Sequence, residues 1–195
     1  CTTLLFFCLY FLRGGYFMEK KQTWHVLPAI VAAGIMSFTG VLIETSMNIT
    51  FPVLMKTFGV GADSIQWITT GYLLAIAVTV PLSAYFIRNF AARHLFIISN
   101  LLFLLGIAID GFAGSLGMLL FGRVLQGIGT GIALPLMFQI ILTQVSTEQR
   151  GIMMGIGNMT TSIAPAIGPT YGGILLTHLG WRSIFWCLVP ILLIS

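Results

Sequence analysis

The sequence predicts an all-α membrane protein, because of its composition and the spacing of its charges. Of 195 residues, 57% are hydrophobic and only 7% are charged, whereas soluble domains carry roughly 25% charged residues. In a bilayer only helices or a closed barrel satisfy the backbone. A barrel needs segments of about ten residues with alternating polarity. The apolar runs here are continuous, so we expect helices.

Charged residues separate the apolar runs, and a membrane-spanning helix needs roughly 20 mostly apolar residues. The predicted helices cover residues 26–50, 64–87, 94–113, 116–142, 150–177 and 182–195, approximately. The last of these is too short to span and the chain stops within it, so we expect a helix truncated at Ser195. Residues 18–195 are therefore interpreted as one six-helix unit.

Residues 1–17 form a doubtful N-terminal extension. The segment "CTTLLFFCLYFL" is apolar but too short to span, and it has no basic region before it. The "MEKK" at Met18 is typical of a bacterial start. We expect residues 1–17 to be upstream sequence translated in error, with a re-entrant or interfacial stretch as the alternative. N-terminal sequencing of the expressed protein distinguishes the two, and a mature start before Met18 would contradict the first.

The basic residues predict a cytoplasmic N-terminus. Positively charged loops stay on the cytoplasmic side, and this orientation places more basic residues inside than outside. The inside set is Lys20, Lys21, Arg88, Arg93 and Arg150, and the outside set is Lys56 and Arg182. We expect a multi-pass protein of a bacterial plasma membrane. Trp67, Trp181 and Asp110 fall near the predicted membrane interfaces, where such residues are common.

Two predicted helices carry a charge inside the membrane, Glu44 and Arg123. A lone charge at the bilayer centre costs about 2.5–3.5 kcal/mol on insertion scales, so each needs a partner. Residues three and four apart share a helix face, and both charges lie on faces of small or polar residues. The first face is Ala33, Ser37, Gly40, Glu44 and Asn48, and the second is Arg123, Gln126, Gly127, Thr130 and Gly131. We expect the opposite charges to pair, which offsets much of the burial cost.

The predicted pair has two interpretations. It is either a structural ion pair that fixes one helix to the other, or a proton-linked switch. Burial favours the neutral form of a carboxyl group, a nearby arginine favours the charged form, and arginine itself stays charged. If the pair separates in one conformation, Glu44 takes up a proton there and releases it when the pair forms again.

The sequence does not predict an enzyme. Its three histidines and three cysteines are scattered without metal-ligand spacing, and no glycine-rich loop ends in Gly-Lys-Ser or Gly-Lys-Thr. We therefore expect no metal site, no cofactor and no nucleic-acid partner.

Four segments match the motifs of one family of transporters. They are "LIETSMNITFP" (42–52), "LFGRVLQGIGTG" (120–131), "GIGNMTTSIAPAIGPTYGG" (155–173) and "WRSIFWCLVP" (181–190). With these the chain resembles the N-terminal half of major facilitator superfamily transporters, and looks closest to drug:proton antiporters with fourteen spans, the multidrug and lincomycin-type efflux permeases. Glu44 stands where the family usually has Asp, Ala164 replaces a glycine, and Leu188 replaces an asparagine. The loop "PLSAYFIRNFAARHL" (81–95) lacks the family's acid, although Arg88 and Arg93 remain.

The resemblance implies a fold and a set of residue roles. The fold is a six-helix half made of two inverted three-helix repeats, with substrate near the membrane midplane. The partner half, and any two extra helices of a fourteen-span rather than a twelve-span protein, would follow Ser195. Glu44 and Arg123 would couple protons, Arg88 and Arg93 would lie in a cytoplasmic loop, and three residues would line the cavity: Asn48, Gln126 and Thr130. A kinked helix abutting the other half would use Gly155, Ala164, Pro165, Gly168, Pro169, Gly172 and Gly173.

The resemblance also implies a function. It is proton-coupled efflux of drugs, or of other amphipathic or cationic small molecules, driven by the proton gradient without a cofactor. The partners would be the lipid bilayer, the substrate and the missing C-terminal half. A transporter of another solute, such as a metabolite exporter or a symporter, and a non-transporting membrane scaffold remain alternatives.

Overall fold

The computed structural model describes residues 26–195, and within that range the chain forms helices and no strands. Segment 1–17, Lys20 and Lys21, on which some expectations above depend, lie outside the described residues. Five long helices are followed by two short ones. They are α2 (Val26–Phe58), α3 (Ala62–Asn89), α4 (Ala92–Gly111), α5 (Leu116–Gln144), α6 (Thr147–His178), α7 (Ser183–Trp186) and α8 (Val189–Ile194).

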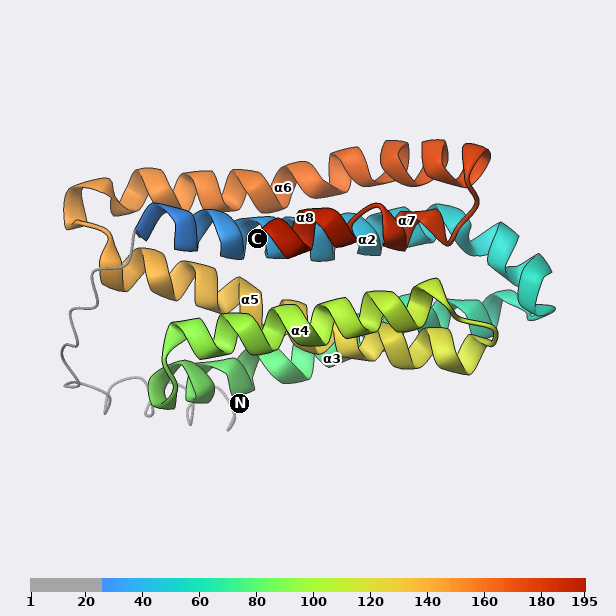
Figure 1. Cartoon of the computed structure of the whole chain (residues 1–195), viewed down its shortest axis with the longest axis horizontal. Coiled ribbons are helices and arrows are strands. Elements are labelled where there is room, and N and C mark those ends of the chain that lie inside the picture. Colours follow the sequence, from blue (N-terminus) through green and yellow to red (C-terminus); the bar gives the residue numbers. More distant parts are fainter. Residues whose placement is uncertain (1–25) are drawn as a thin grey trace, which may run out of the picture.

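Four of the described helices are long and apolar enough to cross a membrane, namely α2, α3, α4 and α5. Helix α6 has 32 residues but is not among them, because its glycines, prolines, threonines and Asn158 dilute its apolar residues. It nevertheless lies alongside α2 over much of its length (Figure 1). A helix of this composition is suited to a position against other helices.

The helices form two layers, with α2, α6, α7 and α8 in one and α3, α4 and α5 in the other (Figure 1). The two expected repeats begin at α2 and at α5, and the first helix of each packs on the second helix of the other. Thus α2 lies against α6, and α5 lies against α3. This exchange is what two repeats related by an in-plane axis produce, and it agrees with the predicted six-helix fold.

The first helix runs past its predicted end at residue 50 and includes Pro52. A proline removes one backbone donor and strains a helix, but here it does not end it. The helix ends at Gly59, which has a φ of +63°, and the N–H of Val60 donates to the carbonyl of Met55 at 3.2 Å. This is the usual geometry of a helix that stops at a left-handed glycine.

The predicted helix 182–195 is divided into α7 and α8. Pro190 lies in the first turn of α8. It has no N–H to donate to the carbonyl of Trp186, so the hydrogen-bond ladder of a continuous helix is broken at that point. Cys187 and Leu188 therefore separate the two short helices.

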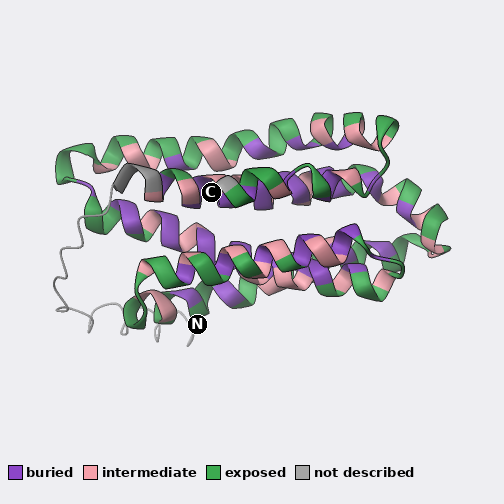
Figure 2. Cartoon of the chain, viewed as in Figure 1, coloured by how far each residue is buried: buried purple, intermediate pink, exposed green. Residues whose placement is uncertain are grey.

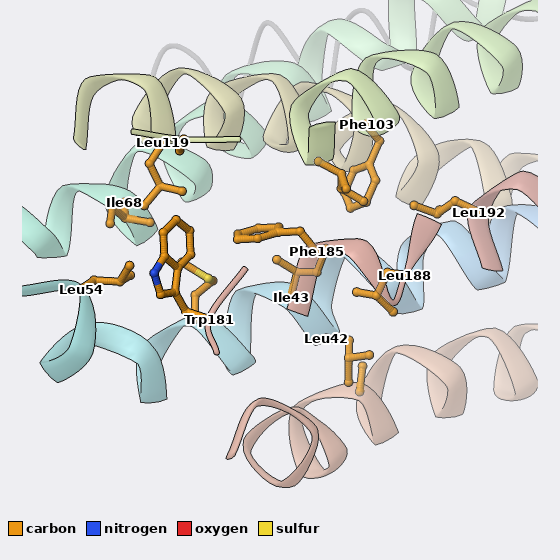
Figure 3. Packing of buried hydrophobic residues seen from close by; sticks show 14 of the residues in the cluster. Leu42, Ile43, Leu54, Ile68, Phe103, Leu119, Trp181, Phe185, Leu188 and Leu192 are labelled. Carbon is orange, nitrogen blue, oxygen red and sulfur yellow. The ribbon is translucent and has the colours of Figure 1, made fainter. Parts of the chain in front are cut away.

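Trp181 lies in the core rather than at the membrane interface, so its predicted place in an aromatic belt is wrong. Only 8% of its surface is exposed. Its ring lies edge-on to Phe58 and Phe185, with ring centroids 6.0 and 6.4 Å away, a favoured arrangement for aromatic pairs. Figure 3 shows these side chains meeting others from both layers. The tryptophan therefore closes the core between the layers.

Helix α5 has a long buried face (Figure 2). Its glycines bring it against two neighbours at once. A Cβ added at Gly127 would lie 2.6 Å from the carbonyl oxygen of Tyr72 on α3, and one at Gly129 would lie 2.7 Å from that of Ser99 on α4. Small residues permit such backbone contact between membrane helices. Polar side chains beside them on α5 are consequently enclosed by protein.

The glycine-rich segment of α6 packs within the unit. Ala164, Gly168 and Gly172 are buried, and the hydroxyl of Ser46 on α2 donates to the carbonyl of Gly168 at 2.9 Å. The expectation that this face awaits the other half is thus wrong for these three residues, because the side chains of α2 fill it. Two other glycines of the motif, Gly155 and Gly173, have open space around them. The two prolines, Pro165 and Pro169, are exposed, and the helix continues through both.

We predict that Gly168→Leu destabilises the protein and that Gly173→Leu does not. A Cβ at Gly168 would lie 2.8 Å from the Cβ of Thr45, whereas nothing lies within 4 Å of one at Gly173. Overpacking of a close contact costs about 1–3 kcal/mol. The measurement is thermal unfolding of the complete membrane protein in detergent. Equal melting temperatures for the two variants would show that α6 does not depend on this contact.

Candidate functional site

The candidate site is built around a polar stripe on α5. Arg123, Gln126 and Thr130 follow one another at spacings of three and four residues, which places them on one helix face, and all three are fully buried. The glycines beside them hold α3 and α4 close to this face. The stripe therefore lies between three helices, away from the surface.

Arg123 has two neighbours that hold its guanidinium. Its Nη1 donates a hydrogen bond to Oε1 of Gln126 at 2.8 Å, and its Cζ lies 4.3 Å from the centre of the Tyr72 ring. A cation over an aromatic face is stabilised most when both are desolvated. Among the described residues, its Nε and Nη2 have no hydrogen-bond partner. The arginine thus keeps donors for another acceptor.

Asp110 is the buried acid of the site. It lies in the last turn of α4 and is fully buried, whereas the sequence placed it at the membrane interface. Nε2 of Gln126 donates to its Oδ2 at 2.9 Å. Its Oδ1 lies against Gly122 and has no hydrogen-bond partner in the described part of the chain. The sequence signal for this burial is Gly106, four residues earlier, which packs against Gln126.

Tyr72 links this cluster to α2. Its hydroxyl donates to the carbonyl of Gly40 at 3.0 Å and lies 3.1 Å from the hydroxyl of Thr130. A Cβ on Gly40 would lie 2.6 Å from the oxygen of Thr130, so only a glycine allows α2 this near. The cluster therefore joins four helices, α2 to α5.

Glu44 follows Gly40 by one helical turn and is half-buried. The expected ion pair between Glu44 and Arg123 is not formed in this conformation, since no salt bridge or hydrogen bond joins the two within residues 26–195. Arg123 is instead connected to Asp110 through Gln126. The two charges are still close enough to act on each other electrostatically. The half-exposed Glu44 keeps some hydration and has less need of a partner than a fully buried acid.

The three residues expected to line a cavity are placed differently from one another. Gln126 and Thr130 are fully buried, so they do not line a cavity in this conformation. Asn48 is exposed and accepts a hydrogen bond from the hydroxyl of Thr69 at 3.3 Å. Asn48 belongs to the α2 stripe, which consists of Ala33, Ser37, Gly40, Glu44 and Asn48. Burial falls along this stripe from Ala33 to Asn48, and the surface opens at Glu44. The accessible part of the stripe is therefore its second half.

The expected loop arginines lie on either side of the link between α3 and α4. Arg88 is in the last turn of α3 and Arg93 is the second residue of α4, and both are exposed. Neither contributes to the buried cluster. Among the described residues, no group of three His, Cys, Asp or Glu side chains could hold a metal ion.

The site combines one buried cation with two acids of different exposure. Arg123 and Asp110 neutralise each other when both are ionised, and Glu44 adds a negative charge beside them. Isolated charges are costly away from water, so the three groups are electrically balanced when they hold one additional proton. A change in their pairing therefore changes how readily a proton binds.

A helical unit of several apolar spans with buried charges defines a class, the polytopic membrane proteins, in which such charges often mark pathways for ions or substrates. The family model of the Major Facilitator Superfamily matches residues 31–195. The chain belongs to this superfamily.

Several curated relatives are similar to the chain. The uncharacterized MFS-type transporter YhcA of Bacillus subtilis is 42% identical over 165 residues, covering 85% of this chain and 31% of the relative. The lincomycin resistance protein LmrB of the same organism is 40% identical, covering 91% and 37%. The multidrug export protein EmrB of Haemophilus influenzae is 30% identical, covering 83% and 32%. The chain thus spans about a third of the length of these relatives.

A solved structure has the same fold. It is a bacterial homologue of the human lysosomal transporter Spinster, in an inward-facing and unoccupied conformation. The TM-score is 0.68 at 18% identity, over 84% of this chain and 37% of that one. At this identity the likeness concerns the arrangement of the helices alone.

We predict that Tyr72→Phe and Tyr72→Leu lower stability by different amounts. The phenylalanine keeps the ring beneath Arg123 and loses the hydroxyl contacts, so its cost should be about 1 kcal/mol. The leucine also removes the cation–π contact, which contributes about 2 kcal/mol when desolvated. Chemical or thermal unfolding of the complete protein measures both. Equal costs for the two variants would show that the ring does not stabilise the arginine.

Proposed function

We propose that the protein containing this chain exports amphipathic or cationic small molecules across a bacterial plasma membrane in exchange for protons. The observation that supports this most is the state of Glu44. It is a half-buried acid without a hydrogen-bond partner in residues 26–195, beside an arginine with unused donors. The names of two relatives, for lincomycin resistance and multidrug export, favour drugs as the class of substrate.

Proton coupling in this proposal comes from the pairing of Glu44 with Arg123. When the two are apart, as in this conformation, the carboxyl group is stabilised by a proton because a lone buried charge is costly. When a rearrangement brings them together, the arginine favours the carboxylate and the proton leaves. The membrane potential supplies about 2.3 kcal/mol per charge per 100 mV.

The substrate surface in this proposal includes the open half of the α2 stripe. Glu44 and Asn48 lie on it, and Thr69 of α3 adjoins Asn48. A carboxylate on a surface with low-dielectric walls concentrates cations, which suits a cationic substrate. The remaining walls would come from the rest of the protein, with the N-terminus in the cytoplasm.

We predict that Glu44→Gln lowers proton-driven efflux of ethidium by about tenfold or more, because it removes a coupling free energy of the usual size. The matched control is Glu148→Gln, which makes the same change at an exposed residue of the first turn of α6. The measurement is ethidium transport by the complete transporter in proteoliposomes with an imposed pH gradient.

The outcomes separate the alternatives. Undiminished proton-driven efflux in Glu44→Gln would remove Glu44 from coupling. If the unmodified transporter moves no ethidium but another solute with protons, the function stands as transport with a different substrate. If it shows no proton-linked flux at all, the proposed function is contradicted and a scaffold is favoured.

A further inference from the structure

The buried cluster contains an acid for which the proposed function has no role. Asp110 is fully buried on α4, and the coupling scheme uses only Glu44 and Arg123. A buried acid is costly, and a leucine or alanine at this position would pack against α5 without that cost. Asp110 nevertheless lies in direct contact with Gln126, the hydrogen-bond partner of Arg123, and this suggests a role in the site.

We propose that Asp110 is a second proton-binding carboxyl group of this site, and that it sets the position of Arg123 through Gln126. This inference rests on the proposed function, because it assigns Asp110 to the same proton-coupled cycle. Asp110 is a positioning residue in this scheme. It acts on Arg123 and does not touch the substrate.

Gln126 connects Asp110 to Arg123. The Gln126 side chain donates to Oδ2 of Asp110 at 2.9 Å and accepts from Nη1 of Arg123 at 2.8 Å. These two hydrogen bonds fix the orientation of the Gln126 amide, because its nitrogen faces Asp110 and its oxygen faces Arg123. The three side chains form a single chain of hydrogen bonds whose two ends are charged when Asp110 is ionised, and hydrogen bonds to charged groups are about twice as strong as neutral ones.

The two carboxyl oxygens of Asp110 differ in their hydrogen bonding. Oδ1 has no hydrogen-bond partner among the described residues, whereas Oδ2 is bonded to Gln126. A proton can therefore bind to Oδ1 without breaking an existing hydrogen bond. Once it does, the carboxyl group is neutral, and its attraction for the guanidinium falls while the contact with Gln126 can persist.

Asp110 and Glu44 compete for the guanidinium of Arg123. Arg123 has unused donors at Nε and Nη2, and Glu44 lies one turn from Gly40, which contacts the Tyr72 hydroxyl beneath Arg123. When Asp110 is ionised, it holds Arg123 by way of Gln126. When Asp110 is protonated, Arg123 is free to pair with Glu44. The two carboxyl groups thus bind their protons alternately.

The surroundings of Asp110 contain few other charges. The titratable group that acts on Asp110 is Arg123 on α5, and Arg123 in turn has Tyr72 on α3 and Glu44 on α2 as neighbours. Beyond the end of α4, Arg182 donates to the carbonyl of Ala113 at 2.9 Å, and Cys187 follows α7 as an exposed thiol. Arg123 is therefore the charge that Asp110 most strongly affects.

Proton exchange at Asp110 requires a change of conformation, because the residue is closed off by its neighbours. Gly106 and Gly122 pack α4 and α5 in backbone contact at this level, with a Cβ at Gly106 lying 2.6 Å from the carbonyl oxygen of Gly122. Water can reach Oδ1 only when α4 and α5 separate. The proton on Asp110 is thereby linked to a movement of the helices, as a coupled transporter requires.

The test is the pH dependence of ethidium efflux by the complete transporter carrying Asp110→Asn. The asparagine oxygen still accepts the hydrogen bond from Gln126, but the charge and the proton site are gone. Arg123 is then free to pair with Glu44 and favours its charged form, so the pH of half-maximal efflux should fall by about one unit. Ethidium affinity measured without a gradient should fall, because Arg123 then neutralises the Glu44 carboxylate that attracts cations. The matched control is Asp63→Asn, at an exposed acid in the first turn of α3, and its profile should equal the wild type.

The outcomes are distinguishable from failure of the proposed function. If the wild type shows proton-driven efflux and Asp110→Asn binds ethidium normally with an unchanged pH profile, the role of Asp110 is wrong and the function stands. If Asp110→Asn does not reach the membrane, Gln126→Leu replaces it, since it cuts the same connection and leaves both charges, and the same shift is expected. Loss of both variants from the membrane would assign Asp110 to folding alone and overturn the proposal.

Discussion

The structure depends on the enclosure of one positive charge, the guanidinium of Arg123, inside a helical unit. A charge there is tolerated only with compensation, and it comes from three directions: the Tyr72 ring, the Gln126 amide and, through that amide, Asp110. These groups belong to α3, α4 and α5. Because burial of the charge requires all three helices to be close, the glycines that permit backbone contact at Gly122, Gly127 and Gly129 are part of the same arrangement.

The compensation is incomplete, and the proposed function follows from that incompleteness. A permanent structural ion pair would place a carboxylate directly against the guanidinium. Here two of its nitrogens lack partners within the described residues, while Glu44 stands half-buried nearby. Asp110 and Glu44 both act on this guanidinium, so the arrangement offers it two acids as partners. Small changes in helix position can therefore exchange one pairing for another, which is the property a proton-coupled cycle needs.

Much of the fold could be predicted from the sequence because membrane helices are specified by composition. Apolar runs between charges located the long helices, and the motifs at 120–131 and 155–173 indicated a family to which the chain does belong. The errors have local causes. Pro52 does not end α2, since the chain terminates it with the left-handed Gly59, and Pro190 divides the last segment by removing a donor. Trp181 is in the core because the rings of Phe58 on α2 and Phe185 on α7 pack against it.

The sequence by itself determined that Glu44 and Arg123 need protein around them, because a lone charge in lipid is costly wherever the helices lie. It also determined that glycine-rich faces bring helices into contact. Only the tertiary structure decided which faces meet. It placed Gly168 and Gly172 against α2 and Asp110 against Gln126, so Arg123 is connected to an acid on α4 and not to Glu44. The partner of a buried charge depends on distances between helices, and these distances are set by packing among residues far apart in the chain.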